Sequence, residues 1–250
     1  MIGQALPFGG LEFTIPLVLV ALIVFVIVAL VTARRDPDPA GQRPYAIYLV
    51  LIVFVALFVA LFGAAAVASN VVQIPLSERA SAFSQFTTPV QAGVPSVAPL
   101  VPVTSDADNE HIRGAVQAGL ILVAALGILW FHVRRMRELV EPPAFRFSPG
   151  RRTYQVYLHS VTFVATVILL FATAAALYGV ARIIAPGTTG SLGAPSTIER
   201  DAGITQAVTA GILAIGAYAI AWYHWMRTRT LQERVSRPPR PGEPPPPPPA

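Results

Sequence analysis

Five long apolar runs, none of which contains an aspartate or a glutamate, constrain this 250-residue chain more than any other feature. A helix needs about 20 residues to cross the hydrocarbon core of a bilayer, which is about 30 Å thick. Because lipid offers no partners for backbone amides, such runs can span a membrane only as helices. We therefore predict an all-α integral membrane protein with five transmembrane helices. The predicted spans are Phe13–Ala33, Tyr45–Ala68, Ile112–His132, Tyr154–Ala181 and Gly203–Met226.

The composition supports this class and excludes several kinds of site. Only 12% of the residues are charged, whereas soluble domains carry about 25%. The chain has no cysteine, which excludes a disulfide framework, a Cys-ligated metal and a thiol nucleophile. All 18 basic residues are arginine, and proline and alanine are abundant. This pattern is typical of a GC-rich coding genome, and we predict a bacterial source.

The arginines indicate an orientation. The first run follows a leader that has no positive charge, so we expect a retained helix and not a cleaved signal peptide. Fourteen arginines lie between the first two spans, between the third and fourth, or after the fifth, and only four lie on the opposite side. The positive-inside rule then predicts an external N-terminus and a cytoplasmic C-terminus in the bacterial cytoplasmic (inner) membrane. The net charge of +5 does not form a basic stripe, so we expect no nucleic acid partner.

The chain also contains an internal repeat. A shift of 109 residues aligns residues 43–66 with residues 152–175 and gives 11 identities in 24 positions. The identities include an Arg-x-Tyr-x2-Tyr opening in both copies. The second helix of each copy matches as well, from Glu-x3-Gly-x2-Gln-Ala at its start to Trp-x-His-x2-Arg-x-Arg at its close. Each copy begins and ends on the same predicted side, so we predict one extra N-terminal helix and two helical hairpins that are parallel repeats.

This organisation predicts five segments along the chain. They are an N-terminal transmembrane helix with a cytoplasmic linker (1–42), hairpin repeat 1 (43–139) with a long external loop (69–110), a cytoplasmic linker (140–151), hairpin repeat 2 (152–231), and a disordered Pro-rich cytoplasmic tail (232–250).

The two matched ends resemble an uncharacterised bacterial membrane family, a domain of unknown function that is built on such a duplicated hairpin. The resemblance covers residues 43–139 and 152–231 and depends on the Arg-x-Tyr-x2-Tyr openings and the Trp-x-His-x2-Arg closings. It implies the fold. It implies no activity and no catalytic residue, because the family has none established.

Histidines near the predicted cytoplasmic side are the first candidates for chemistry. His132 and His224 occupy matched positions, and His159 lies at a similar depth, so the three are candidate haem ligands. The alternative that we favour is a belt of interfacial anchors, in which aromatic rings lie at headgroup level and arginines reach lipid phosphate. The predicted anchors are Arg43, Tyr45, Tyr48, Trp130, His132, Arg152, Tyr154, Tyr157, Trp222 and His224.

Two glutamines are the only matched polar residues that enter a span. Gln117 and Gln206 lie about two turns from the predicted outer ends. A polar side chain in lipid needs a partner, so an interhelical hydrogen bond is one interpretation. The other interpretation is a polar contact on a path between the two repeats.

These observations predict a non-enzymatic protein with no catalytic residue, no metal site and no cofactor. We expect a structural, interaction or accessory subunit of a membrane assembly, whose partners are the lipid bilayer and either further copies of the chain or other membrane subunits. One alternative is a small transporter or channel module with Gln117 and Gln206 near its path. A second alternative is a haem-binding electron-transfer subunit that uses the histidines.

Overall fold

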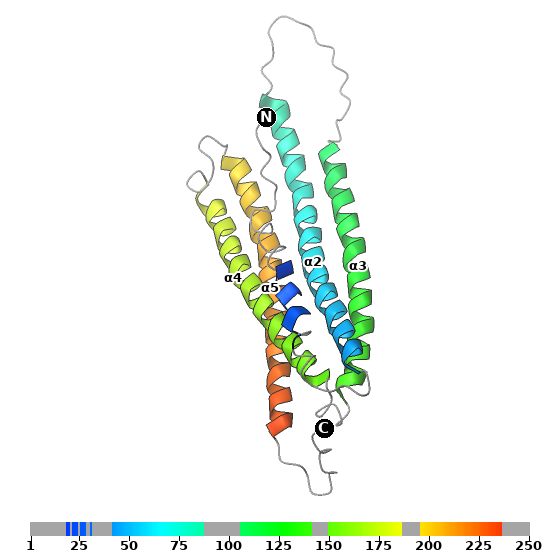
Figure 1. Ribbon diagram of the computed structural model, residues 1–250. Helices are drawn as coiled ribbons and strands as arrows, with labels where there is room; N and C mark the ends of the chain where they lie inside the picture. Colours follow the sequence, from blue (N-terminus) through cyan, green and yellow to red (C-terminus); the bar gives the residue numbers. More distant parts are fainter. Residues whose placement is uncertain are drawn as a thin grey trace, which may run out of the picture. The chain divides into compact units, whose positions relative to one another are not determined.

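The computed structural model describes residues 19–20, 22–24, 26–28, 31, 42–87, 106–141, 150–186 and 196–236. Four helices make up most of this part of the chain, with α2 beside α3 and α4 beside α5 (Figure 1). Their bounds are α2, Gln42–Thr87; α3, Asp106–Val140; α4, Gly150–Ile184; and α5, Ser196–Ser236.

The predicted all-α class is confirmed for the described residues. Each of the four helices is long and apolar enough to cross a membrane, and the mean hydropathy of its best window is between 1.7 and 3.0. The predicted first span, Phe13–Ala33, lies mostly outside the described residues, although those of its residues that are described are helical.

The helices extend well beyond the predicted spans, and this corrects the predicted loop at 69–110. The helix α2 continues through Pro75 to Thr87, and α3 begins at Asp106, so both ends of that loop are helical. Hydropathy predicts only the part of a helix that can lie in the hydrocarbon core. The backbone hydrogen bonding of the helix can continue beyond that part. The predicted linker 140–151 and tail 232–250 are shortened for the same reason, because α4 begins at Gly150 and α5 ends at Ser236.

The start of α5 has a recognisable local cause. Ser196 and Glu199 form the Ser-x-x-Glu pattern that favours a helix N-terminus. Glu199 lies in the first turn, where a carboxylate interacts favourably with the helix dipole. At the other end of α4, Arg182 lies in the last turn, where a cation is favourable.

The chain divides into two compact units, and each helix contributes to both. The first unit comprises residues 1–61, 123–172 and 213–250. Its core is apolar, and its fully buried large side chains include Phe54 and Phe58 of α2, whose rings lie 5.0 Å apart, and Leu158 and Ile168 of α4. This unit holds every histidine and tyrosine that the repeat singles out.

The second unit comprises residues 62–122 and 173–212 and is packed through small residues. Ala65, Ala118 and Ala210 are buried in it. A Cβ added at Gly63 would lie 3.3 Å from the Cβ of Leu122, so α2 and α3 approach closely there. Small residues at such crossings are typical of membrane helix packing.

Large apolar side chains remain exposed on all four helices. On α3 only 11% of the most apolar window is buried, compared with 50% on α2. The exposed residues on α3 include Leu120, Val123 and Trp130, each more than 60% exposed. Apolar surface on this scale marks an interaction with lipid or with another protein.

Candidate functional site

Each of the two matched histidines lies against a matched tyrosine. In the first pair, the Tyr48 hydroxyl of α2 lies 3.5 Å from Nε2 of His132 on α3. In the second pair, the Tyr157 hydroxyl of α4 lies 3.1 Å from Nε2 of His224 on α5. The ring planes meet edge-on in both pairs, with centroids 6.0 Å apart in the first and 5.6 Å apart in the second. The same pair of residue types therefore joins the two helices of each hairpin.

The backbone fixes the proton on each imidazole. Nδ1 of His132 lies 2.8 Å from the carbonyl oxygen of Ile128, and Nδ1 of His224 lies 2.8 Å from that of Ile220. A carbonyl oxygen only accepts, so Nδ1 carries the hydrogen and donates. Nε2 of the neutral ring is then an acceptor, and the tyrosine hydroxyl donates to it.

The two pairs differ sharply in burial. Tyr157 is 1% exposed and His224 is 5% exposed, whereas Tyr48 is 51% exposed. Tyr157 also stacks on Tyr154, with centroids 5.9 Å apart. A buried hydrogen bond in a low-dielectric surrounding is stronger, and its loss is more costly, than an exposed one. The second pair therefore contributes more to the packing of its hairpin than the first pair does.

Burial also separates the predicted anchors into two groups. Tyr45, Tyr48, Trp130 and Trp222 are exposed, as an interfacial belt requires. Arg152 is exposed as well, Tyr154 and His132 are half-buried, and Arg43, Tyr157 and His224 are buried. The interpretation as anchors does not describe these last three, because a side chain enclosed by protein cannot lie among headgroups.

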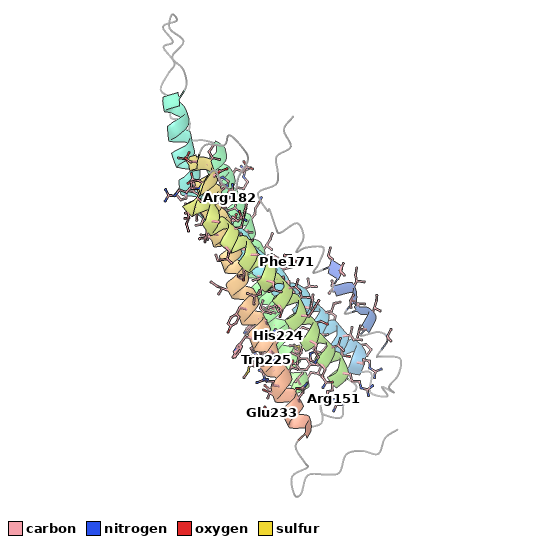
Figure 2. The ribbon with its side chains drawn as sticks, turned by 90° about the vertical axis from the view of Figure 1, so that its left-hand side faces the viewer. Arg151, Phe171, Arg182, His224, Trp225 and Glu233 are labelled. Carbon is pink, nitrogen blue, oxygen red and sulfur yellow. The ribbon has the colours of Figure 1, made fainter. Side chains whose placement is uncertain are left out.

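In each hairpin an arginine side chain folds back onto the aromatic ring that immediately precedes the matched histidine. The guanidinium of Arg135 lies 5.7 Å from the ring centre of Phe131, and the matched Arg227 lies 5.5 Å from that of Tyr223. Nε of Arg227 also donates to the Tyr223 hydroxyl at 3.2 Å. Next to His224 on α5 (Figure 2), Trp225 has Arg229 3.8 Å above its ring. These cation–π contacts hold positive charge at the level of the aromatic residues.

The arrangement of the histidines bears on the haem and metal alternatives. An iron ligand would donate the Nε2 lone pair, which in both matched histidines accepts the tyrosine hydroxyl. His159 is exposed, and the structure records no contact that joins it to either pair among the described residues. Those residues likewise contain no group of three potential metal ligands.

The matched glutamines lie in different surroundings. Oε1 of Gln206 accepts a hydrogen bond from Nη1 of Arg182 on α4 at 3.4 Å, so it joins the two helices of its hairpin. Gln117 is exposed on α3. No hydrogen bond from Gln117 to another described residue is present. The structure therefore does not bring the two glutamines into a common arrangement.

A glycine of the second helix lies at a helix crossing in each hairpin, at matched positions. A Cβ at Gly179 of α4 would lie 2.7 Å from the backbone nitrogen of Ala207 on α5, and a Cβ at Gly203 would lie 2.9 Å from the Gly179 carbonyl oxygen. In the other hairpin, the Asn70 side chain fills the space where Gly114 lacks a Cβ. The 109-residue shift pairs Asn70 with Gly179. The crossing at Gly179 brings two backbones into direct contact, whereas the crossing at Gly114 has the Asn70 side chain between the helices.

The sequence identified the members of both pairs but not the pairs themselves. A signal was present, since a tyrosine opens each hairpin and a histidine closes it on the same predicted side. Because both residues recur together in both copies, the repeat could have suggested that they meet.

Comparison with known proteins adds no relative. No family model, no curated protein and no solved structure matches this chain.

Proposed function

We propose that this chain is a non-enzymatic multi-pass protein of the bacterial cytoplasmic membrane and that it serves as a structural or accessory subunit of a membrane assembly. Five spans, formed by residues 13–33 and helices α2 to α5, would carry it across the bilayer. The exposed apolar side chains of the four helices support this proposal, because in water they would drive aggregation.

The observation that carries the structural role is the engagement of both matched histidines in hydrogen bonds inside their own hairpins. Each imidazole uses Nδ1 on a backbone carbonyl and Nε2 on a tyrosine hydroxyl. A general base or a metal ligand needs one of these nitrogens available to a substrate or an ion. The pairs are suited instead to fix the register of two helices.

Matched contacts support the proposed duplication and, with it, the proposed membership of the uncharacterised family. The tyrosine–histidine pairs, the arginine–aromatic contacts and the crossings at Gly114 and Gly203 each occur in both hairpins at aligned positions. Independent sequences would not place three kinds of contact at aligned positions. Parallel duplication also supports the proposal that both hairpins begin and end on the same side of the membrane.

Neither alternative function has an observation that favours it. A path shared by Gln117 and Gln206 would need the two amides to face one route, and the Gln206 amide is bound to Arg182. Haem binding by His132 and His224 would first have to break both tyrosine hydrogen bonds.

Cysteine labelling tests the proposed disposition, because the chain has no cysteine of its own. Glu141→Cys, after α3, and Ser196→Cys, at the start of α5, are both at exposed positions. In intact cells, a membrane-impermeant maleimide should label Ser196→Cys and leave Glu141→Cys unlabelled until the membrane is opened. The opposite pattern would overturn the orientation, and immediate labelling of both would overturn the proposal that α4 crosses the membrane.

A further inference from the structure

One face of α2 is covered, and the matched face of α4 is open. The covered α2 face consists of Val50, Phe54, Leu57 and Leu61, which have the i, i+4, i+7, i+11 spacing of a single helix face. Phe54 is 0% exposed and Leu61 is 7% exposed. The 109-residue shift matches these residues to the open α4 face, which consists of His159, Phe163, Thr166 and Leu170. All four are exposed, Phe163 by 63% and Leu170 by 66%.

A different face of the two helices is buried in both. Leu49 of α2 and the matched Leu158 of α4 are both 1% exposed, and Ala56 and Ala165 are both buried. These residues belong to the face that each helix uses within its own hairpin. The covered α2 face is a different face, and we attribute its burial to packing between the two hairpins.

A contact between the hairpins is formed by Leu61 of α2 and Gly216 of α5. The Leu61 side chain occupies the space that a Cβ at Gly216 of α5 would need, so α2 and α5 join the two hairpins there. Aligning the Trp-x-His ends matches Gly216 to Ala124 of α3. Ala124 is exposed, and Gly127, one turn further along α3, has no atom within 4 Å of the position where its Cβ would lie.

The helix α3 thus repeats the pattern of α4. Ala125 of α3 and the matched Ala217 of α5 are both buried, at 4% and 0% exposed, and belong to the face used within each hairpin. Ile220 of α5 is half-buried, whereas the matched Ile128 is exposed. We name Ala124, Gly127 and Ile128 the open α3 face.

Two polar residues, His159 and Thr166, lie on the open α4 face and are suited to contact with protein. An imidazole within a membrane span is costly in contact with lipid and usually faces other protein. His159 lies inside the predicted span and on this face. The Thr166 hydroxyl bonds to the Thr162 carbonyl at 2.8 Å, and such a threonine can also approach a neighbouring helix closely.

We propose that the open α4 face of one copy packs on the open α3 face of a second copy and repeats the α2–α5 contact, with Leu170 at Ala124 in the way that Leu61 lies at Gly216. This inference rests on the proposed membrane disposition and names the partner as the chain itself. Both copies keep the same orientation in the bilayer, because α4 runs as α2 does and α3 as α5 does. The contact joins two different faces, so it is heterologous and links copies head to tail into a ring or a row.

Cross-linking between two differently tagged copies tests the contact. One copy carries Leu170→Cys and the other carries Ala124→Cys, and oxidation in native membranes should link the two tags. Leu61→Cys with Gly216→Cys in one chain is the positive control for the same geometry. Phe171→Cys is the matched negative control, since Phe171 (Figure 2) is 58% exposed but lies about 100° around α4 from Leu170.

The outcomes separate the proposal from its competitors. A link between the two tags at Leu170 and not at Phe171 supports a second copy. A link from Leu170→Cys only to a cysteine at Val24 of the same chain would mean that the first span covers this face and would overturn the proposal. No link at all, while the Leu61–Gly216 control forms, would mean that lipid covers it and would equally overturn the proposal. The maleimide labelling is independent of these results, so failure of the membrane disposition would be recognised separately.

A second measurement does not depend on cysteine chemistry. Leu170→Gln should raise the dissociation constant between copies about tenfold or more, because it removes an apolar contact worth about 1.4 kcal/mol. Phe171→Gln should leave the association unchanged. Equal effects of the two substitutions on the oligomer distribution in native mass spectrometry would contradict the assigned face.

Discussion

Removing a single oxygen from Tyr157 should reveal how much the buried pair stabilises its hairpin. Tyr157→Phe keeps the ring, and with it the stacking on Tyr154 and the edge-on contact with His224. It deletes the donor that lies 3.1 Å from His224 Nε2. Because both residues are almost fully buried, solvent has little access to replace that donor, and Nε2 is expected to become a buried acceptor without a partner.

The expected cost follows from that unmet acceptor. A buried polar group left without its hydrogen bond costs about 1–3 kcal/mol in soluble proteins. Hydrogen bonds between membrane helices average about 0.6 kcal/mol and reach about 1.7 kcal/mol. We expect Tyr157→Phe to lower the free energy of unfolding by about 1–2 kcal/mol, the upper part of the membrane range, because the pair is so completely enclosed.

The chain supplies its own matched control. In Tyr48→Phe the deleted hydroxyl lies 3.5 Å from His132 Nε2, and the tyrosine is 51% exposed. Such a long, accessible hydrogen bond should contribute less than about 0.5 kcal/mol. Reversible unfolding of both variants in mixed micelles, by titration with a denaturing detergent, measures the difference. Equal losses, or a larger loss for Tyr48→Phe, would refute the assignment of the buried pair as the stronger link.

Three further substitutions test separate features. Gly179→Ala should destabilise the protein by about 1–3 kcal/mol in the same titration, because backbone atoms of α5 occupy the space of the new methyl group; Gly211→Ala has no such neighbour and should stay within about 0.5 kcal/mol of the parent. Pro75→Ala should increase the protection of nearby amides from hydrogen exchange, because it restores a donor inside α2; unchanged exchange would mean that the helix is already closed there. Trp225→Leu should cost about 0.5–1 kcal/mol through the lost contact with Arg229, and a loss that persists in Arg229→Gln would show that the cation is not involved.

The four described helices could be predicted because hydropathy identifies the apolar part of each one. The runs at 45–68, 112–132, 154–181 and 203–226 each lie inside a helix of the structure, because length and apolar character decide whether a span can form. The helix ends were missed, most clearly where α2 continues to Thr87. Outside the apolar run, a helix is sustained by local hydrogen bonding and packing, which leave no simple mark on hydropathy.

The sequence predicted which residues are important in the two tyrosine–histidine pairs, but it did not predict that they contact each other. The repeat singled out Tyr48, Tyr157, His132 and His224, but a contact across 84 or 67 residues depends on how the two helices of a hairpin are set in register. That register follows from the loops and from crossings such as Gly179 on Gly203. The difference in burial between the pairs is harder still to predict from the sequence, because the paired residue types are the same and burial depends on their neighbours in the fold.

The crossing at Asn70 differs from the aligned crossing at Gly179 by one side chain between the helices. Asn70 is held in place by its own amide, which donates to the Ala66 carbonyl at 2.8 Å, and it acts as a spacer above Gly114. The aligned glycine in the other copy leaves nothing between the two backbones. A single difference in residue type therefore decides whether the two helix backbones meet directly or have a side chain between them at this level.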